Sequence, residues 1–242
     1  MNSLNPQFNR VDYSLRRYFV DEFHFRRVPE LSSGSQVLDL GGNKIRKRGQ
    51  FDIEQYNLRV IYANFSTVKQ PDVQADAAHI PFKTSSFEVV ICSELLEHVP
   101  SPLNVLSEIH RVLCPGGILL ICVPFLYHIH GDPEDYGRYT DHYWRENLMQ
   151  LGFAKVEIER QGLFWSVLID MLRELAYQMS KESRPRSAWL RRQVVRLIGI
   201  GKQTALAWEK KPGCYGHPFF NRFTTGFGIV ASKPNIKKEA VL

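Results

Sequence analysis

The sequence lacks the apolar segments that membrane insertion and secretion require. It contains no run of about 18 uncharged apolar residues, so we expect no membrane-spanning helix. Its first residues, MNSLNPQFNRVDYSL, include no apolar core of a signal peptide, so we expect no secretory signal. Both absences favour a cytoplasmic protein.

Cysteine is scarce as well, with four in 242 residues. Cys92, Cys114, Cys122 and Cys214 form no C-x-x-C pair and show no zinc-type spacing. Because three of them lie beside apolar runs, we expect reduced, buried thiols in a cytoplasmic compartment. The sequence therefore predicts neither a disulfide framework nor a metal site.

Charge is plentiful and mostly positive. The formal net charge is +6, and basic residues cluster at 16–27, 44–48 and 181–202. Such clusters attract nucleic acids and anionic membrane surfaces alike, and the sequence alone does not place them on one face. No RNA-binding module and no N-P-P-Y tetrapeptide accompany them, which makes a nucleic-acid partner the less attractive interpretation.

The middle of the chain alternates strand-like and helix-like segments. FEVVICS (87–93) and GILLICVPF (117–125) are almost continuously apolar, as strands covered on both faces of a parallel sheet are. Shorter apolar runs at 36–40 and 59–64 predict two further strands. Strands that alternate with helical crossovers predict an α/β fold with a doubly wound, mostly parallel sheet.

The segment between the two long strands has clear helix boundaries. Ser101 is a suitable N-cap, Pro102 suits the first turn, and the glycines after Pro115 end the helix. Its inner face would be formed by Leu103, Leu106, Ile109 and Leu113.

The second half of the chain predicts a helix, two strands and an insert. We expect a helix at 141–151, with Trp144 and Leu148 on one face, and strands at 154–160 and 223–233. About 60 residues with helical periodicity separate these strands, too many for a plain loop. The predicted divisions are an N-terminal helical or cap segment (1–34), a cofactor-binding α/β core (35–160), a helical insert (161–222), and the last strand with a tail (223–242).

The motifs of the core resemble those of a known family. A Gly-Gly pair ends the first strand in VLDLGGNK, where a doubly wound fold brings its backbone close to a ligand. The segment DAAHIPFKTSSFEVVICSELLEHVPSPLNVLSEIHRVLCPGGILLICVPF (76–125) resembles the class I S-adenosylmethionine-dependent methyltransferases, type 11 group. The resemblance implies a Rossmann-like fold of seven strands and S-adenosyl-L-methionine as cofactor.

The resemblance also assigns cofactor contacts. Asp39 and the glycines would line the methionine moiety, Asn64 stands where the family has an acid for the ribose hydroxyls, and Asp76 would accept from the adenine amino group. The full set is Asp39, Gly41, Gly42, Asn64, Asp76, Ala77, Ser93, Glu94, Leu95 and His98, the last near the mouth where substrate enters.

Three positions depart from the family pattern. Asn43 and Ile45 replace glycines of the first loop, and Asn64 replaces the ribose acid. A neutral amide gives a weaker hydrogen bond than a carboxylate, which predicts weaker cofactor binding. A non-catalytic binding protein is therefore an alternative to an enzyme.

A polar window follows the fifth strand and reads IHGDPEDYGRYTDHYW (129–144). Methyl transfer from a sulfonium to a hydroxyl requires alignment and removal of a proton, and histidine is the side chain best placed to take it. We expect His128 or His130 to be the base, with Asp132 or Asp135 orienting it. Side chains expected to shape the acceptor pocket are Tyr127, Tyr136, Arg138 and Tyr139.

The same window has a structural interpretation. It would then be a turn whose tyrosines pack on the sheet and whose Thr140 or Asp141 caps the next helix. The histidines would in that case carry no proton in a reaction.

The sequence does not decide which molecule accepts the methyl group. The window resembles a segment of family members that tailor sugars or lipid-linked glycans, which implies O-methylation of a small-molecule, sugar or lipid-linked glycan acceptor. The insert, with aromatic residues beside arginines, suits either a cap over the site or a membrane-surface element through 163–208. The membrane interpretation favours a quinone or lipid-ring acceptor and peripheral membrane contact.

Overall fold

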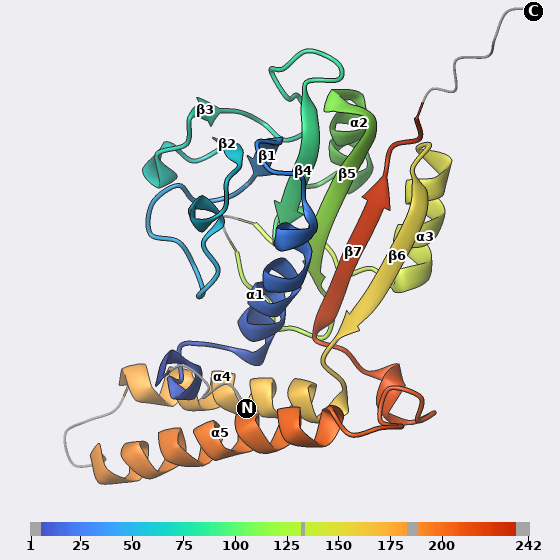
Figure 1. The fold of residues 1–242 in the computed structure, drawn as a ribbon. Coiled ribbons are helices and arrows are strands. Elements are labelled where there is room, and N and C mark those ends of the chain that lie inside the picture. Colours follow the sequence, from blue (N-terminus) through green and yellow to red (C-terminus); the bar gives the residue numbers. More distant parts are fainter. Residues whose placement is uncertain (1–5, 132–133, 183–187, 236–242) are drawn as a thin grey trace, which may run out of the picture.

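A single seven-stranded sheet organises the chain (Figure 1). The computed structural model describes residues 6–131, 134–182 and 188–235. The strand order is β3-β2-β1-β4-β5-β7-β6, and only β7 runs antiparallel to its neighbours. The strands are β1 (Gln36–Leu40), β2 (Arg59–Asn64), β3 (Val73–Gln74), β4 (Phe87–Ser93), β5 (Leu113–Pro124), β6 (Ala154–Gln161) and β7 (Gly226–Ser232).

Helices cover both faces of this sheet. The α-helices are α1 (Leu15–Arg27), α2 (Pro102–Val112), α3 (Asp141–Gln150), α4 (Phe164–Glu182) and α5 (Ala188–Glu209). On one face Val20 and Phe23 of α1 pack in a buried cluster with Val37 and Ile91 of the strands. On the other face α2 and α3 bury their apolar sides in a second, larger cluster. The doubly wound, mostly parallel fold predicted from the sequence is confirmed.

Most predicted elements lie where the pattern placed them, with local exceptions. Strands β1, β2 and β4 have the predicted bounds, and Thr140 caps α3 by accepting from the Tyr143 backbone. Ser101 precedes α2 but makes no side-chain capping bond. Strand β5 starts at Leu113, earlier than predicted, because the chain pairs with Phe87 of β4 before its register shifts.

One crossover departs from the expected helical form. In the described chain, the connection from β1 to β2 contains a short 3-10 turn, Ile53–Gln55, and no α-helix. The N-terminal helix α1 packs on that face of the sheet instead. The apolar pattern of the core therefore predicted the strands of the sheet correctly. It did not predict that the helix on this face would be α1, from the start of the chain, and not a crossover helix between β1 and β2.

The insert is a pair of helices, α4 and α5, side by side below the sheet (Figure 1). Helical periodicity predicted α4, but its apolar stripe faces outward: Met171, Leu175 and Met179 are each at least half exposed. The inner face of α4 instead buries the charged pair Asp170 and Arg173.

That inner face holds the start of the chain. Asp170 accepts hydrogen bonds from the backbone N–H groups of Leu15 and Arg16, both at 2.7 Å, and so caps the first turn of α1. From α5, the buried Lys202 ammonium donates to the carbonyls of Phe8, Arg10 and Tyr13 at 2.6–2.7 Å. Both contacts tie the insert to the N-terminal segment.

Replacing Lys202 by methionine tests this tie. The change leaves three carbonyl acceptors without their donor, and a single unsatisfied buried group costs roughly 1–3 kcal/mol. We expect Lys202→Met to lower the free energy of unfolding by at least about 2 kcal/mol, measured by urea denaturation. The exposed Lys210 is the control, and Lys210→Met is expected to change it by less than about 0.5 kcal/mol. Equal effects of the two changes would contradict this account.

Candidate functional site

A cavity of about 760 Å³ opens at the carboxyl ends of β1, β2 and β4. This is the edge where open α/β sheets bind ligands, and the volume suits a small-molecule cofactor. All ten side chains or backbone positions predicted to contact the cofactor lie in its lining: Asp39, Gly41, Gly42, Asn64, Asp76, Ala77, Ser93, Glu94, Leu95 and His98. The sequence therefore located this cavity.

The Gly-Gly loop after β1 forms a tight cradle. A Cβ atom on Gly42 would lie 2.2 Å from the Asp39 carboxyl carbon, so no other residue fits there without displacing that side chain. Asn64 donates from Nδ2 to the carbonyls of Gly41 (2.8 Å) and Gly42 (3.0 Å) and accepts at Oδ1 from Ser66 N–H. The amide expected to hold ribose hydroxyls is thus engaged in holding the loop.

Two acidic side chains, Asp39 and Asp76, line the cavity. Burial raises the pKa of Asp39 to about 7, and Lys47 opposes that rise. The Asp76 carboxylate accepts from Ala78 N–H at 2.9 Å and lies 3.1 Å from His79 Nδ1, and these bonds lower its pKa. The two lining acids therefore differ: burial favours the protonated form of Asp39, whereas hydrogen bonds favour the ionised form of Asp76.

Helix α1 forms one wall of the cavity, which the sequence analysis did not predict. Arg17, Val20, Asp21 and His24 line the cavity, although they lie outside the motif segment. His24 is buried, its Nε2 lies 3.0 Å from Ser93 Oγ, and burial lowers its pKa to about 4. Nothing in the local sequence signals this role, because only the fold brings α1 to the sheet edge.

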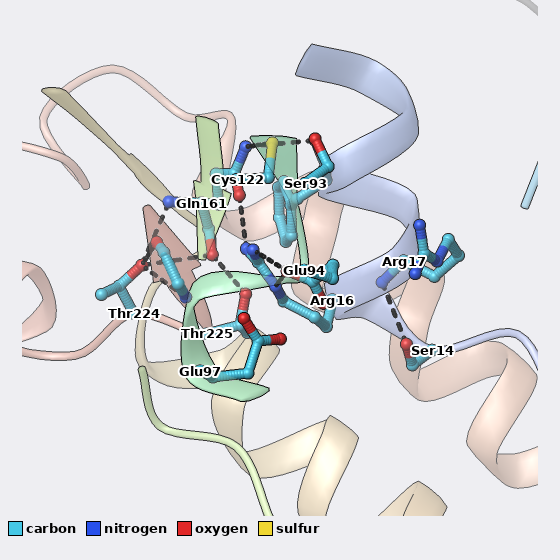
Figure 2. Close-up of polar contacts among 12 residues, drawn as sticks. Ser14, Arg16, Arg17, Ser93, Glu94, Glu97, Cys122, Gln161, Thr224 and Thr225 are labelled. Atoms are coloured by element: carbon cyan, nitrogen blue, oxygen red, sulfur yellow. Dashed lines mark hydrogen bonds and ion pairs between the residues drawn. The ribbon is translucent and has the colours of Figure 1, made fainter. Parts of the chain in front are cut away.

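A buried ion pair joins Arg16 of α1 to Glu94, which lines the cavity (Figure 2). Arg16 donates to Glu94 Oε1 from Nε (3.1 Å) and Nη2 (2.5 Å), and its Nη1 donates to Gln161 of β6. Burial alone would raise the Glu94 pKa, but the guanidinium holds it below its usual value. Glu94 therefore contributes backbone to the lining while its charge is neutralised from α1.

The polar window after β5 is held by an internal ion pair. Arg138 binds both oxygens of Asp135 at 2.5 and 2.7 Å and, through this bond, lowers the Asp135 pKa to about 2. Asp135 also accepts from His130 N–H at 2.9 Å. Asp135 and Arg138 thus shape the loop that carries His130, and Asp132 lies outside the described residues.

The tyrosines of the window have different environments. Tyr136 lines the cavity and is about half exposed. Tyr139 stacks on Tyr143 with ring centroids 4.2 Å apart and meets Trp144 edge-on, so it packs against the core, as the structural interpretation expected. Tyr127 stacks beside His128, with ring centroids 4.3 Å apart.

Three histidines are grouped beside the cavity: His98 is one of its lining residues, whereas the predicted bases His128 and His130 are not. The ring of His98, which lines the cavity, is 5.0 Å from that of His130, and the ring of His128 is 5.6 Å from His130. Beneath them lies Glu97, whose pKa burial raises to about 8. Of the two predicted bases, His130 is in contact with the cavity lining through His98.

Comparisons with known proteins identify the core. The family described as "Methyltransferase domain" matches residues 35–121. Those residues belong to the class I S-adenosylmethionine-dependent methyltransferases, type 11 group. The cofactor of this domain is S-adenosyl-L-methionine. The glycine loop at Gly42, beside Asp39, suits it because glycine lets the protein backbone approach a ligand closely.

The relatives are distant and partial. Ubiquinone biosynthesis O-methyltransferase of Psychrobacter cryohalolentis is 26% identical over 155 residues, which cover 56% of this chain and 57% of that protein. The chain thus matches little more than half the length of this relative.

Solved structures show the same fold at low identity. A methyltransferase from Archaeoglobus fulgidus has a TM-score of 0.54 at 16% identity, covering 90% of this chain and 94% of its own. The cyclase SpnF has a TM-score of 0.56 at 17% identity, covering 90% and 82%.

Substitution of Gly42 tests the cradle. The Cβ of Gly42→Ala would collide with the Asp39 carboxylate and shift the loop, so we expect S-adenosylmethionine affinity to fall by at least about tenfold in calorimetry, on the order of 1.4 kcal/mol. Gly216 has only one distant neighbour for an added Cβ, and Gly216→Ala is expected to bind as the wild type does. Unchanged affinity of the Gly42 variant would show that the loop is not the cofactor's cradle.

Proposed function

We propose that the protein transfers the methyl group of S-adenosylmethionine to a hydroxyl oxygen of a small-molecule acceptor. The observation that carries this proposal is a histidine group beside the cofactor cavity: His98 lines the cavity, its ring contacts that of His130, and the ring of His130 contacts that of His128. A hydroxyl acceptor needs its proton removed during transfer, and imidazole is the side chain suited to do so near neutral pH.

The reaction is an in-line displacement at the methyl carbon. The acceptor oxygen forms a bond to that carbon while the carbon–sulfur bond breaks, and the electron pair stays on sulfur, giving neutral S-adenosylhomocysteine. The leaving thioether needs no acid, so the protein's tasks are alignment and deprotonation. Tyr136, which lines the cavity, and Arg138, which holds the adjoining loop, are the proposed acceptor-side groups.

A sugar or lipid-linked glycan remains the proposed acceptor class from the resemblance of the window. A lipid-soluble ring is the second candidate. It is supported by the name of the Psychrobacter relative and by the outward apolar side of the insert, where Met171, Leu175 and Leu197 are each more than half exposed. Exposed arginines of α5, Arg192 and Arg196, accompany that surface. None of the described helices is both long and apolar enough to span a bilayer.

A binding protein without transferase activity is the candidate from another class. It is supported by Asn43, Ile45 and the engagement of Asn64 with the glycine loop. Calorimetry with S-adenosylmethionine, followed by an assay for S-adenosylhomocysteine release over a panel of phenols, catechols and glycosides, separates binding from turnover. Cofactor binding without turnover of any acceptor would favour this alternative.

Removal of the window histidines tests the proposed chemistry. We expect His128→Ala and His130→Ala each to lower kcat by about 10²-fold or more, the usual contribution of proton transfer, with cofactor affinity unchanged. His142 is exposed on α3 in the same window, and His142→Ala is the matched control. Wild-type turnover by both variants would remove the histidine-assisted mechanism.

Vesicle flotation tests the lipid-soluble candidate. We expect the protein to float with vesicles containing phosphatidylserine at low salt, and Met171→Glu with Leu175→Glu to weaken binding at least about tenfold, since charge is placed on the apolar side. The control is Met149→Glu, at an exposed methionine of α3. No flotation of the wild type would dispose of the membrane interpretation.

A further inference from the structure

The carboxylate of Glu97 is buried and makes no hydrogen bond that stabilises the described fold. Its side chain is 1% exposed, and in the described part of the chain neither oxygen has a hydrogen-bond partner. The two nearby arginines are already paired, Arg16 with Glu94 and Arg138 with Asp135. An ionised carboxylate buried without a hydrogen-bond donor is costly, so this group is either protonated or paired with a cation. Among the described residues, its recorded ion-pair contact is with His98 Nε2, at 3.6 Å.

Two imidazoles face that carboxylate. His98 Nε2 lies 3.6 Å from Glu97 Oε1, and His98 and His130 meet with ring centroids 5.0 Å apart. One ligand atom from each of Glu97, His98 and His130 lies within 4.8 Å of those of the other two. Glu97 lies close to the Arg16–Glu94 pair in Figure 2, and its neighbour His98 lines the cofactor cavity.

The other ring nitrogen of each histidine is already bonded to protein. His98 Nδ1 is 2.6 Å from the Glu134 carbonyl oxygen, so Nδ1 carries the proton and Nε2 keeps its lone pair. His130 Nδ1 is 3.2 Å from the His128 carbonyl and 3.5 Å from Asp135 Oδ2, while the nearest donor, Arg138 Nη2, is 3.5 Å away. Two acceptors favour the proton at Nδ1 here too. Ligating histidines are oriented by second contacts of this kind.

We propose that Glu97, His98 and His130 bind a divalent transition-metal ion at the acceptor end of the cofactor cavity. Two histidines and a carboxylate are a ligand set for Zn²⁺ and Fe²⁺ that leaves coordination positions open. Tetrahedral ligands at about 2.1 Å stand roughly 3.4 Å apart, so the three side chains close by about an ångström on binding. The Glu94 carboxylate, held by Arg16, takes no part.

The ion gives the proposed methyl transfer a way to activate its acceptor, and this step rests on the proposed function. The acceptor hydroxyl binds at an open position, where a metal lowers the pKa of a bound O–H group by several units. Its proton passes to His128, which lies outside the ligand set and is partly exposed, and then to solvent. The oxygen attacks the methyl carbon, and the sulfur retains the electron pair of the broken bond.

Binding of the metal alone tests the site. Untagged chain, stripped with a chelator, is titrated with Zn²⁺ by calorimetry and with Co²⁺ by visible absorption. We expect one ion per chain, with d–d bands of nitrogen and oxygen ligation. Glu97→Gln and His130→Asn are each expected to weaken binding by on the order of 100-fold, whereas His217→Asn, at an exposed histidine, should bind as the wild type does.

The outcomes separate this proposal from the proposed function. Absence of a bound ion, or equal binding by His130→Asn and the wild type, overturns the metal site whatever the activity. S-adenosylmethionine affinity is measured on the same variants and is expected to stay within about threefold of the wild type. If the wild type binds the ion but no cofactor, the proposed function fails and the metal site stands. Because Glu97→Gln preserves volume, its unfolding midpoint checks the fold, and His130→Asn provides an independent test.

Discussion

The buried ion pair of Arg16 and Glu94 is the constraint on which the site depends. The two side chains are 1% and 10% exposed, so their attraction must offset the cost of removing both charges from water. That offset requires several hydrogen bonds, and the guanidinium makes them to Glu94 and to Gln161 of β6. It also requires space, since a Cβ on Gly226 of β7 would lie 2.3 Å from Arg16 Nη1. One side chain of α1 thereby bonds to β6 and to the residue that follows β4, and it lies against β7.

The consequence for the cavity is direct. With Arg16 fixed, α1 places Arg17, Asp21 and His24 along the cavity, and Asp21 accepts from the backbone of Gln50 at 2.7 Å to hold the loop after β1. The same ion pair neutralises Glu94, and the nearby Glu97 carboxyl is buried with no hydrogen-bond partner among the described residues. Cofactor wall, glycine loop and histidine group thus depend on one arginine.

The sequence predicted the parts that depend on local pattern. Apolar runs gave strands β1, β2 and β4 with correct bounds. The ten predicted cofactor positions, four at the ends of β1 and β2 and six in the motif segment at 76–125, all line the cavity because these motifs follow the strand ends. It could not predict that α1 covers the site, since the contact of Arg16 with Glu94 spans 78 positions. Nor could it predict which side of α4 is buried, because Asp170 and Arg173 enter the interior only through partners at the start of the chain.

Tyr139 differs from expectation, and Glu97 was not among the predicted site residues. Both stand in segments whose composition suggested chemistry, yet Tyr139 packs between Tyr143 and Trp144, while Glu97 is buried under His98. The hydrophobic periodicity and the residue types of these segments do not show which of the two side chains packs against the core and which lies below a histidine. Only the approach of the window to the turn after β4, fixed by the bond from Tyr136 N–H to the Glu97 carbonyl at 2.7 Å, separates them.

The cap that Asp170 provides to α1 limits how the insert can change in evolution. Inserts at this place in a sheet look like detachable modules, free to be exchanged when a new acceptor is selected. Here the insert supplies the carboxylate that fixes the first turn of the helix carrying Arg16. Exchange of α4 would remove the cap of α1 and loosen the cavity wall that α1 forms, so the insert cannot change without an effect on the cavity.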